Sequence, residues 1–274
     1  MFIGYAQREL SKEAHLSMID LSPNHVPPAI LTLFDVSKPT MPRAFNVLDG
    51  ITNGQIVTDD PVHPTWAAVH EATFGTLYLG GSITPTLLAE IVDHFRQFGD
   101  VGIGCWPDDP LLAMMPPKPD YDGRTLYFTD RSQHIRLEDY IEQIPSDCYL
   151  APRDRGLIGQ SLDYDLTLAT FGSVENVLAH TLGVMLMREN VLLCEAATGA
   201  PTHGRIEIGV TTHEHHRKQG YATITCAQLI KVCEAQGYRT WWDCAKQNRA
   251  SVALARKLGY HNEREYRFVL WSKR

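Results

Sequence analysis

The sequence predicts an α/β (α+β) fold in two parts, an N-terminal α/β domain over residues 1–130 and a second domain over residues 131–274. Three observations support this fold class. In the second half, strand and helix patterns follow one another in the order strand–strand–strand–helix–strand–helix–strand. The first half shows a shorter run, strand–strand–helix–strand. A chain of 274 residues is also long enough for one large domain or two small ones.

The first half contains four strand patterns and one helix pattern with clear ends. "GQIVTDDPVHPTWAAVHEATFGTLYLGG" predicts two strands, at residues 54–59 and 65–79, joined by an Asp-Pro turn. A helix follows, with Thr84 as its start signal, Pro85 at its first helical position and Gly99 as its stop. "VGIGCW" predicts a short buried strand, and "RTLYFTD" predicts a strand that ends just before the domain boundary.

The second half opens with residues 131–181, which predict short helices with little regular strand. The later elements carry stronger patterns and end at capping residues. They are strands at residues 183–188, 191–198 and 205–211, a helix from Gly220 to Gln236, a strand at "TWWDCA", a helix from the cap Asn248 to Leu258 with Ala250, Ala253, Leu254 and Leu258 as its buried stripe and Gly259 as its stop, and a strand at "EYRFVLW".

The composition limits which kinds of partner and which cellular compartment we expect. The formal net charge of -7 argues against nucleic acid or an anionic membrane as the main partner, because both need a cationic surface. The N-terminal residues lack the pattern of a secretory signal, and no stretch approaches the ~20 apolar residues of a membrane span. The six cysteines are scattered and form no C-x-x-C pair. We therefore expect a cytoplasmic protein.

The run "THEHHRKQGYAT" (residues 212–223) raises the question of a metal site. A zincin helix needs H-E-x-x-H, but here the fifth position is Arg217. Adjacent His215 and His216 cannot both face one ion from a helix, and no Cys or Asp cluster nearby completes a set of four ligands. The sequence therefore predicts no metal.

The same run has the features of an anion site. It lies between a strand that ends at Thr211 and a helix that begins near Gly220, so that the amides of the first helical turn are free donors. Arg217 and Lys218 add positive charge, and Gly220 removes a side chain where backbone must approach a ligand. The alternative is a solvated basic turn.

Two motifs favour the anion site through a family resemblance. "RKQGYA" (217–222) resembles the R/Q-x-x-G-x-G/A signature of the GNAT superfamily of acyl-CoA N-acyltransferases, and "NRASVALARKLGY" (248–260) resembles the helix that follows the fifth strand there. The likeness is greatest to a bacterial branch that includes zwittermicin-resistance acetyltransferases. It implies a GNAT-like mixed sheet flanked by helices.

The resemblance also implies a cofactor, acetyl-CoA (coenzyme A), and the residues that bind it. The pantetheine arm pairs with the backbone of the third strand of the second half, and the pyrophosphate lies on the loop that follows. Asn248 caps its helix and helps to hold the cofactor. The expected cofactor-binding residues are Val210, Thr211, Thr212, Arg217, Lys218, Gln219, Gly220, Tyr221, Ala222 and Asn248.

Glu207 is the candidate general base. In "RIEIGV" the isoleucines share one face of the strand, which leaves Glu207 on the other face, in a setting that raises a carboxyl pKa. The alternative is a structural pairing with Arg205 or a neighbouring strand. Asp243 is the second candidate base, acting through water.

Three tyrosines are candidates for the general acid. Ala255 stands where many family members carry a tyrosine that protonates the departing thiolate, and Tyr266 is a candidate substitute, as are Tyr260 and Tyr221. Trp241 and Trp242 face opposite ways on one strand, so we expect one in the core and the other at the acceptor pocket.

The function implied is acetyl transfer to the primary amine of a small molecule, in detoxification or antibiotic self-resistance. Two alternatives stay open: a protein or peptide acetyltransferase, and a catalytically silent acyl-CoA-binding module. Residues 45–130 are expected to form a degenerate copy of the same fold, or an acceptor-binding or dimerising domain, which leaves a homodimer open.

Overall fold

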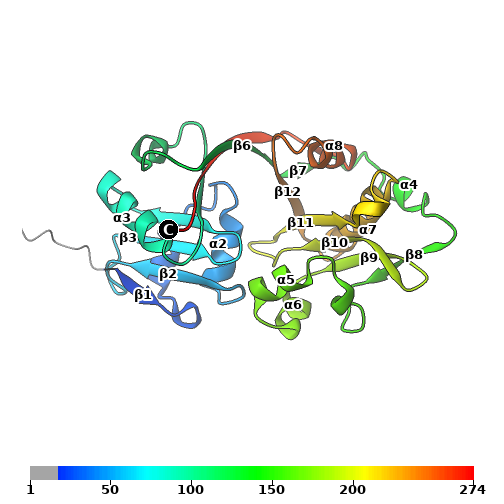
Figure 1. Cartoon of the computed structure of the whole chain (residues 1–274), viewed down its shortest axis with the longest axis horizontal. Coiled ribbons are helices and arrows are strands. Elements are labelled where there is room, and N and C mark those ends of the chain that lie inside the picture. Colours follow the sequence, from blue (N-terminus) through cyan, green and yellow to red (C-terminus); the bar gives the residue numbers. More distant parts are fainter. Residues whose placement is uncertain (1–17) are drawn as a thin grey trace, which may run out of the picture.

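The structure is a computed structural model that describes residues 18–274. One twelve-stranded sheet runs through both halves of the chain, in the order β1-β2-β3-β4-β5-β14-β6-β12-β11-β10-β9-β8. Figure 1 shows the two halves side by side, with β6 and the red C-terminal segment passing between them. The predicted fold class, a mixed sheet flanked by helices, is confirmed.

The first half consists of six strands, three helices and two short 3₁₀ turns. Its elements are β1 (Ile19–Leu21), η1 (Pro23–His25), α1 (Pro28–Leu31), α2 (Met41–Leu48), β2 (Gly54–Thr58), β3 (Trp66–Glu71), β4 (Thr76–Gly81), α3 (Pro85–Phe95), β5 (Val101–Cys105), η2 (Pro110–Met114) and β6 (Tyr121–Phe128).

The second half has the longest helix of the described chain, α7, and the strands that it covers. Its elements are β7 (Asp130–Arg131), α4 (Glu138–Ile141), β8 (Cys148–Pro152), η3 (Ile158–Gln160), α5 (Tyr164–Phe171), α6 (Val174–His180), β9 (Gly183–Arg188), β10 (Val191–Thr198), β11 (Arg205–Thr212), η4 (Glu214–His216), α7 (Tyr221–Ala235), β12 (Arg239–Ala245), α8 (Arg249–Lys257), β13 (Tyr260–His261) and β14 (Arg264–Trp271).

One predicted segment is wrong. Residues 65–79 are not one strand but the hairpin of β3 and β4, which turns at Gly75 with a φ of 64°, a conformation that favours glycine. Residues 131–181 hold short helices with little strand, as predicted, and the strand β8 among them pairs antiparallel with β9. β8 lies at the edge of the sheet and is only partly buried, so its sequence lacks a clear apolar alternation.

The order of strands is symmetric about the pair β14–β6. In each half three antiparallel strands lead into a helix and then into a parallel strand: β2-β3-β4-α3-β5 in the first half and β9-β10-β11-α7-β12 in the second. The strands that follow are exchanged, because β6 pairs with β12 and β14 pairs with β5. The sheet therefore crosses the boundary predicted near residue 130.

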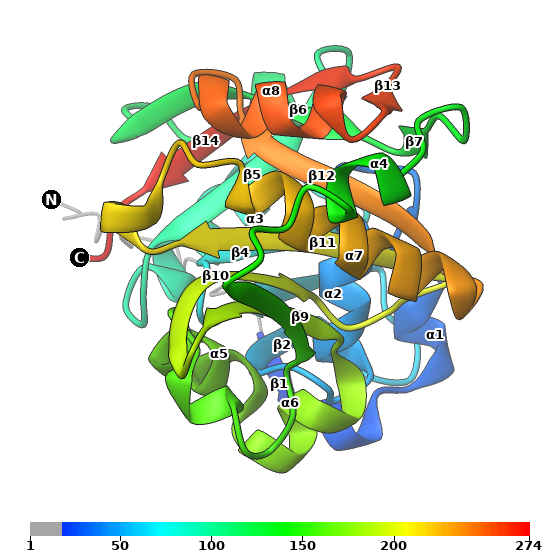
Figure 2. The same cartoon turned by 90° about the vertical axis from the view of Figure 1, so that its right-hand side faces the viewer.

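Each half has its own apolar core beneath its long helix. α3 buries Leu88, Ile91 and Phe95 against β3–β5. α7 buries Cys226, Leu229, Ile230 and Cys233 against the strands of the second half, and Figure 2 shows it lying across β11. The predicted stripe of the next helix is half right: Leu258 is buried and Leu254 packs against the core, but Ala250 and Ala253 are exposed, and Val252 and Ala255 are buried in their place.

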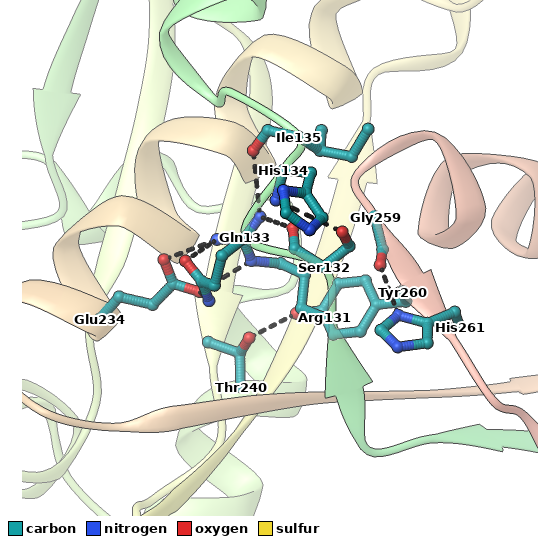
Figure 3. Close-up of polar contacts among 10 residues, drawn as sticks. All are labelled: Arg131, Ser132, Gln133, His134, Ile135, Glu234, Thr240, Gly259, Tyr260 and His261. Atoms are coloured by element: carbon teal, nitrogen blue, oxygen red, sulfur yellow. Dashed lines mark hydrogen bonds and ion pairs between the residues drawn. The ribbon is translucent and has the colours of Figure 1, made fainter.

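A buried ion pair fastens the segment after β6 to the C-terminal end of α7 (Figure 3). Arg131 donates from Nε and Nη2 to the two carboxylate oxygens of Glu234, at 2.7 and 2.8 Å. Its Nη1 donates to the carbonyl of Ser132, at 3.1 Å. Every nitrogen of this guanidinium donates to a partner. The ion pair therefore fixes the position at which the chain passes from one half to the other.

Candidate active site

The strands β11 and β12 separate partway along their length. They pair only from Arg205 to Glu207 and from Arg239 to Trp241. Beyond that point β11 continues to Thr212, with its other edge paired to β10. The backbone of Ile208–Thr212 therefore has one edge without a neighbouring strand among residues 18–274. Such an edge presents free N–H and C=O groups to an extended ligand.

A groove of about 760 Å³ opens from this edge, between the start of α7 and α8. Nine of the ten predicted cofactor-binding residues line it, and Gln219 does not. The exposed small residues of α8 form the opposite wall. The lining residues from the predicted set are Val210, Thr211, Thr212, Arg217, Lys218, Gly220, Tyr221, Ala222 and Asn248.

Gly220 shapes the end of this groove at the start of α7. It precedes the first residue of α7 and has a φ of 84°, which a glycine adopts without strain. Its carbonyl accepts the first bonds of the helix, from Thr223 and Ile224, so the amides of Tyr221 and Ala222 point out of the helix end. A Cβ at position 220 would meet no atom within 4 Å, so the space in front of these amides is open.

The remaining residues of the opening motif lie at the mouth of the groove. Arg217 donates to the carbonyl of Thr212 at 3.3 Å, and His216 lines the groove. The rings of His215 and His216 lie 5.4 and 5.6 Å from that of His213, centre to centre. Within residues 18–274 no three His, Cys, Asp or Glu side chains form a group able to hold a metal.

Asn248 caps its helix as predicted, whereas its role in holding the cofactor stays a prediction. Its side chain accepts a hydrogen bond from the amide of Ser251 at 3.2 Å, which makes it the N-cap of α8, and it also lines the groove.

A second pocket, of about 280 Å³, lies on the other face of β11. Glu207 and Gly209 line it, whereas Ile206, Ile208 and Val210 pack toward α7. Both halves of the chain contribute to its walls: α2 and the β3–β4 turn from the first half, α5 and the β10–β11 loop from the second. Because the groove and this pocket share β11, a thioester in the groove and an acceptor in the pocket would meet at the split.

A charge cluster lies at the inner end of this pocket, with Arg43 and Glu207 in the pocket wall and Asp243 beside Arg43 but outside the wall. Arg43 of α2 donates from Nε to Glu207 Oε2 at 2.8 Å and from Nη2 to Glu207 Oε1, so the pair is bidentate. The same Nη2 lies 3.7 Å from Asp243 Oδ2. The sequence had offered Arg205 as a partner of Glu207. Arg205 instead donates to the hydroxyl of Tyr127 at 3.1 Å, so this predicted pairing is wrong.

Asp243 lies where the strands have parted. Trp241 is the last residue of β12 that pairs with β11, and Asp243 follows two residues later on the same face. The hydroxyl of Tyr266 donates to its carboxylate at 3.1 Å. Trp241 lines the second pocket and Trp242 lies in the core beneath α8, which confirms the opposite orientations predicted for these two side chains.

Burial controls the protonation of the cluster. It raises the pKa of Asp243 to about 7; the nearby charge of Arg43 opposes this rise and that of Glu207 adds to it. Burial likewise raises the pKa of Glu71, at the pocket wall, to about 7. Burial and then the charge of Asp243 raise the pKa of Tyr266 well above 10, so its phenol keeps its proton at neutral pH. A carboxyl that titrates near pH 7 is suited to accept a proton from an ammonium.

Sequence reasoning missed the residues that the first half contributes, chiefly Arg43, Glu71 and Phe74. A weak signal was present for one of them. Arg43 lies in a short helix, "MPRAFNVL", in which the other seven residues are buried. A charged residue in so apolar a helix needs a partner, but nothing in the sequence says which residue that partner is.

The comparisons with known proteins agree with this geometry. The model of the GNAT acetyltransferase family matches residues 36–269. An uncharacterized N-acetyltransferase of Bacillus subtilis (strain 168), YdfB, is 28% identical over 126 residues, which cover 45% of this chain and 48% of that protein. The alignment thus spans about half the length of this curated relative. The chain belongs to the GNAT acetyltransferase family, as its sequence motifs predicted.

Solved structures show the same fold over nearly the whole chain. A GCN5-related N-acetyltransferase-like protein from Streptococcus suis 89/1591 superposes with a TM-score of 0.65 and 24% identity, over 88% of this chain and 96% of its own. A tandem GNAT protein from the clavulanic acid biosynthesis pathway superposes with a TM-score of 0.59 and 10% identity, over 95% and 99% of the two chains. Resemblance to the zwittermicin-resistance branch stays a prediction.

Proposed function

We propose that the protein transfers the acetyl group of acetyl-CoA to the primary amine of a small molecule. The observation that carries this proposal is the split between β11 and β12, which opens to a groove with free helix amides on one side and to an acidic pocket on the other. A narrow pocket of about 280 Å³ favours a small acceptor over a folded protein. Detoxification or self-resistance is the biological setting that we propose for this activity.

The groove residues would hold the cofactor as the family resemblance implies. The free edge at Val210, Thr211 and Thr212 pairs with the pantetheine arm and polarises the thioester carbonyl. The pyrophosphate lies on the amides that follow Gly220, with the cations of Arg217 and Lys218 beside it.

We propose Asp243 as the general base, because Glu207 is engaged in a bidentate pair with Arg43. Asp243 takes a proton from the bound ammonium, and the neutral amine attacks the thioester carbonyl. The C–S bond then breaks, and the thiolate takes a proton through Tyr266, whose phenol is hydrogen-bonded to the newly protonated Asp243. Glu207 thereby has a positioning role.

A pH profile distinguishes the two carboxylates. Glu207→Gln removes a negative charge near Asp243 and lowers its pKa, so the rise of kcat/KM with pH moves to lower pH. Arg43→Met removes a positive charge, raises that pKa and moves the rise to higher pH. We therefore expect the pH dependence of kcat/KM to shift in opposite directions in the two variants. Loss of activity in Glu207→Gln at every pH, in a folded protein, would instead make Glu207 the base.

For the first half we propose a degenerate GNAT-like domain that binds no cofactor. Its strands and helix repeat the order and pairing of the second half, and the tandem GNAT protein offers a precedent for such an architecture. The edge of β4 that corresponds to the free edge of β11 is covered by its own chain. The amide of Gly81 donates to the carbonyl of Leu33 at 3.2 Å, and a Cβ on Gly80 would lie 2.9 Å from that oxygen.

This arrangement predicts one bound coenzyme A per chain. Titration calorimetry with coenzyme A should give a stoichiometry of about one, because the edge of β4 is occupied while that of β11 is open. A stoichiometry of two would contradict the proposed role of the first half.

The proposed function is tested by thiol release from acetyl-CoA in the presence of a panel of small amines, with mass spectrometry of the products. We expect thiol release that depends on the amine, together with the N-acetyl product. Turnover on peptides alone would favour the protein acetyltransferase, and cofactor binding without turnover on any acceptor would favour the silent module. Cytoplasmic location and a homodimer stay predictions.

A further inference from the structure

The pocket beside β11 combines negative charge with apolar walls, and both properties come partly from the first half. Three carboxylates, of Glu71, Glu207 and Asp243, lie around the guanidinium of Arg43, which forms ion pairs with the latter two. The other guanidinium of the pocket wall, that of Arg153, is already paired with Glu195 at 3.1 Å. The cluster therefore has a net negative charge when its carboxyl groups are ionised. A ligand that carries an acidic group would add to this repulsion, whereas a cation would relieve it.

Glu71 gives a specific sign of an unfilled polar position. Its side chain lines the pocket, and the residue is 4% exposed. Its Oε2 has no hydrogen-bond partner among residues 18–274. The hydroxyl of Tyr78 lies beside Glu71 but does not line the pocket. Because buried polar atoms in folded proteins are nearly always paired, the carboxylate of Glu71 is placed to contact a polar group of a ligand.

The outer walls of the pocket are apolar and exposed. Phe74, in the turn between β3 and β4, is 49% exposed, and Leu166 of α5 is 43% exposed. One comes from each half of the chain. Deeper in the pocket Trp241 and Phe171 are buried, and the guanidinium of Arg43 lies between the rings of Phe74 and Trp241, at 5.9 and 5.6 Å from their centres. Exposed apolar side chains that face one small pocket are typical of a binding site for an apolar group.

We infer that the acceptor is a primary amine on a hydrophobic body without an acidic group, and that Phe74 of the first half selects it. This inference rests on the proposed function. The ammonium enters toward the carboxylates, and the apolar body remains between Phe74 and Leu166. The first half then determines specificity, although the cofactor groove lies wholly in the second.

Three small probes separate charge from hydrophobicity: 2-phenylethylamine, phenylalanine, which adds only a carboxylate, and ethanolamine, which lacks the apolar body. Their affinity for the protein loaded with coenzyme A is measured by calorimetry, and their kcat/KM by thiol release. We expect 2-phenylethylamine to bind at least about tenfold more tightly than either of the others, since one apolar group in a pocket is typically worth ~10-fold or more. Equal affinities, or no binding of 2-phenylethylamine, would overturn the inference.

The role of Phe74 is tested by Phe74→Ser, with Phe98→Ser as the matched control. Phe98 is 52% exposed and lies beyond the end of α3, away from the pocket. Phe74→Ser should weaken 2-phenylethylamine binding about tenfold, raise KM more than it changes kcat, and leave ethanolamine unaffected. The control should change none of these. An equal effect on both amines, or the same effect from the control, would contradict the assignment.

Binding and turnover distinguish the inference from the function on which it rests. Selective binding of 2-phenylethylamine without thiol release would support the inferred class of ligand and contradict the proposed acetyltransferase activity. Thiol release without selectivity among the amines would support that activity and contradict the inferred acceptor class.

Discussion

Gly220→Val should abolish binding of acetyl-CoA. The glycine lies at the start of α7 with open space in front of it, and a side chain there would project into the place proposed for the pyrophosphate. The helix amides would no longer be reachable by phosphate oxygens. Calorimetry should show no binding heat, and coenzyme A, which raises the melting temperature of wild type by mass action, should leave that of the variant unchanged.

The variant also strains the backbone, and the chain offers a matched control for this. Gly237, at the far end of α7, has a φ of 83°, and a Cβ there also meets no atom within 4 Å. Gly237→Val therefore incurs the same conformational cost, about 1–3 kcal/mol, without approaching the groove. It should lower the melting temperature to a similar extent and bind coenzyme A normally.

Arg217→Ala should weaken binding of acetyl-CoA less than Gly220→Val, because the helix amides remain and a charged hydrogen bond contributes about 1.5–3 kcal/mol.

Normal binding of coenzyme A by Gly220→Val would mean that residues 217–222 are not a phosphate site. The proposed mechanism would then have no binding site for its cofactor.

Asp243→Asn should lower kcat by about 10²–10⁴-fold, the usual cost of losing a general base. The substitution keeps the shape of the side chain and its acceptor oxygen for the Tyr266 hydroxyl, but an amide cannot take the proton. Cofactor affinity should change little, since Asp243 does not line the groove. The activity that remains should no longer rise with pH near 7, where burial places the titration of Asp243.

A control for this variant is Asp130→Asn, which removes a carboxylate of the second half that lies away from both cavities and pairs with Arg239. It should keep wild-type kcat. If Asp243→Asn retains near wild-type turnover across pH, Asp243 is a structural residue and the base must be sought elsewhere in the cluster.

The predictions that held depend on local chemistry. The order β9-β10-β11-α7-β12 could be predicted because apolar periodicity, the glycine before α7 and the Asn248 cap all act over a few residues. For the same reason most of the expected groove residues lie together. The prediction of a single strand at 65–79 was wrong because the chain turns at one glycine. The predicted buried stripe of α8 was wrong at its two alanines, which face the groove instead of the core.

The acidic pocket could not be predicted from local patterns. Arg43 meets Glu207 only because α2 of the first half packs beside the split in the second. Such a pairing depends on how β6 and β14 are exchanged between the halves, and exchanged strands leave no mark on the apolar alternation of either segment. A boundary near residue 130 therefore gave no indication that both halves contribute to the pocket beside β11.

A crystal structure of the protein grown with acetyl-CoA would test the central claim most directly. The account predicts a single cofactor per chain, with its pyrophosphate on the amides after Gly220, its pantetheine arm along Val210–Thr212 and its thioester at the split, facing Asp243. Cofactor density along β4 in the first half, or anywhere that leaves the groove between α7 and α8 empty, would contradict it.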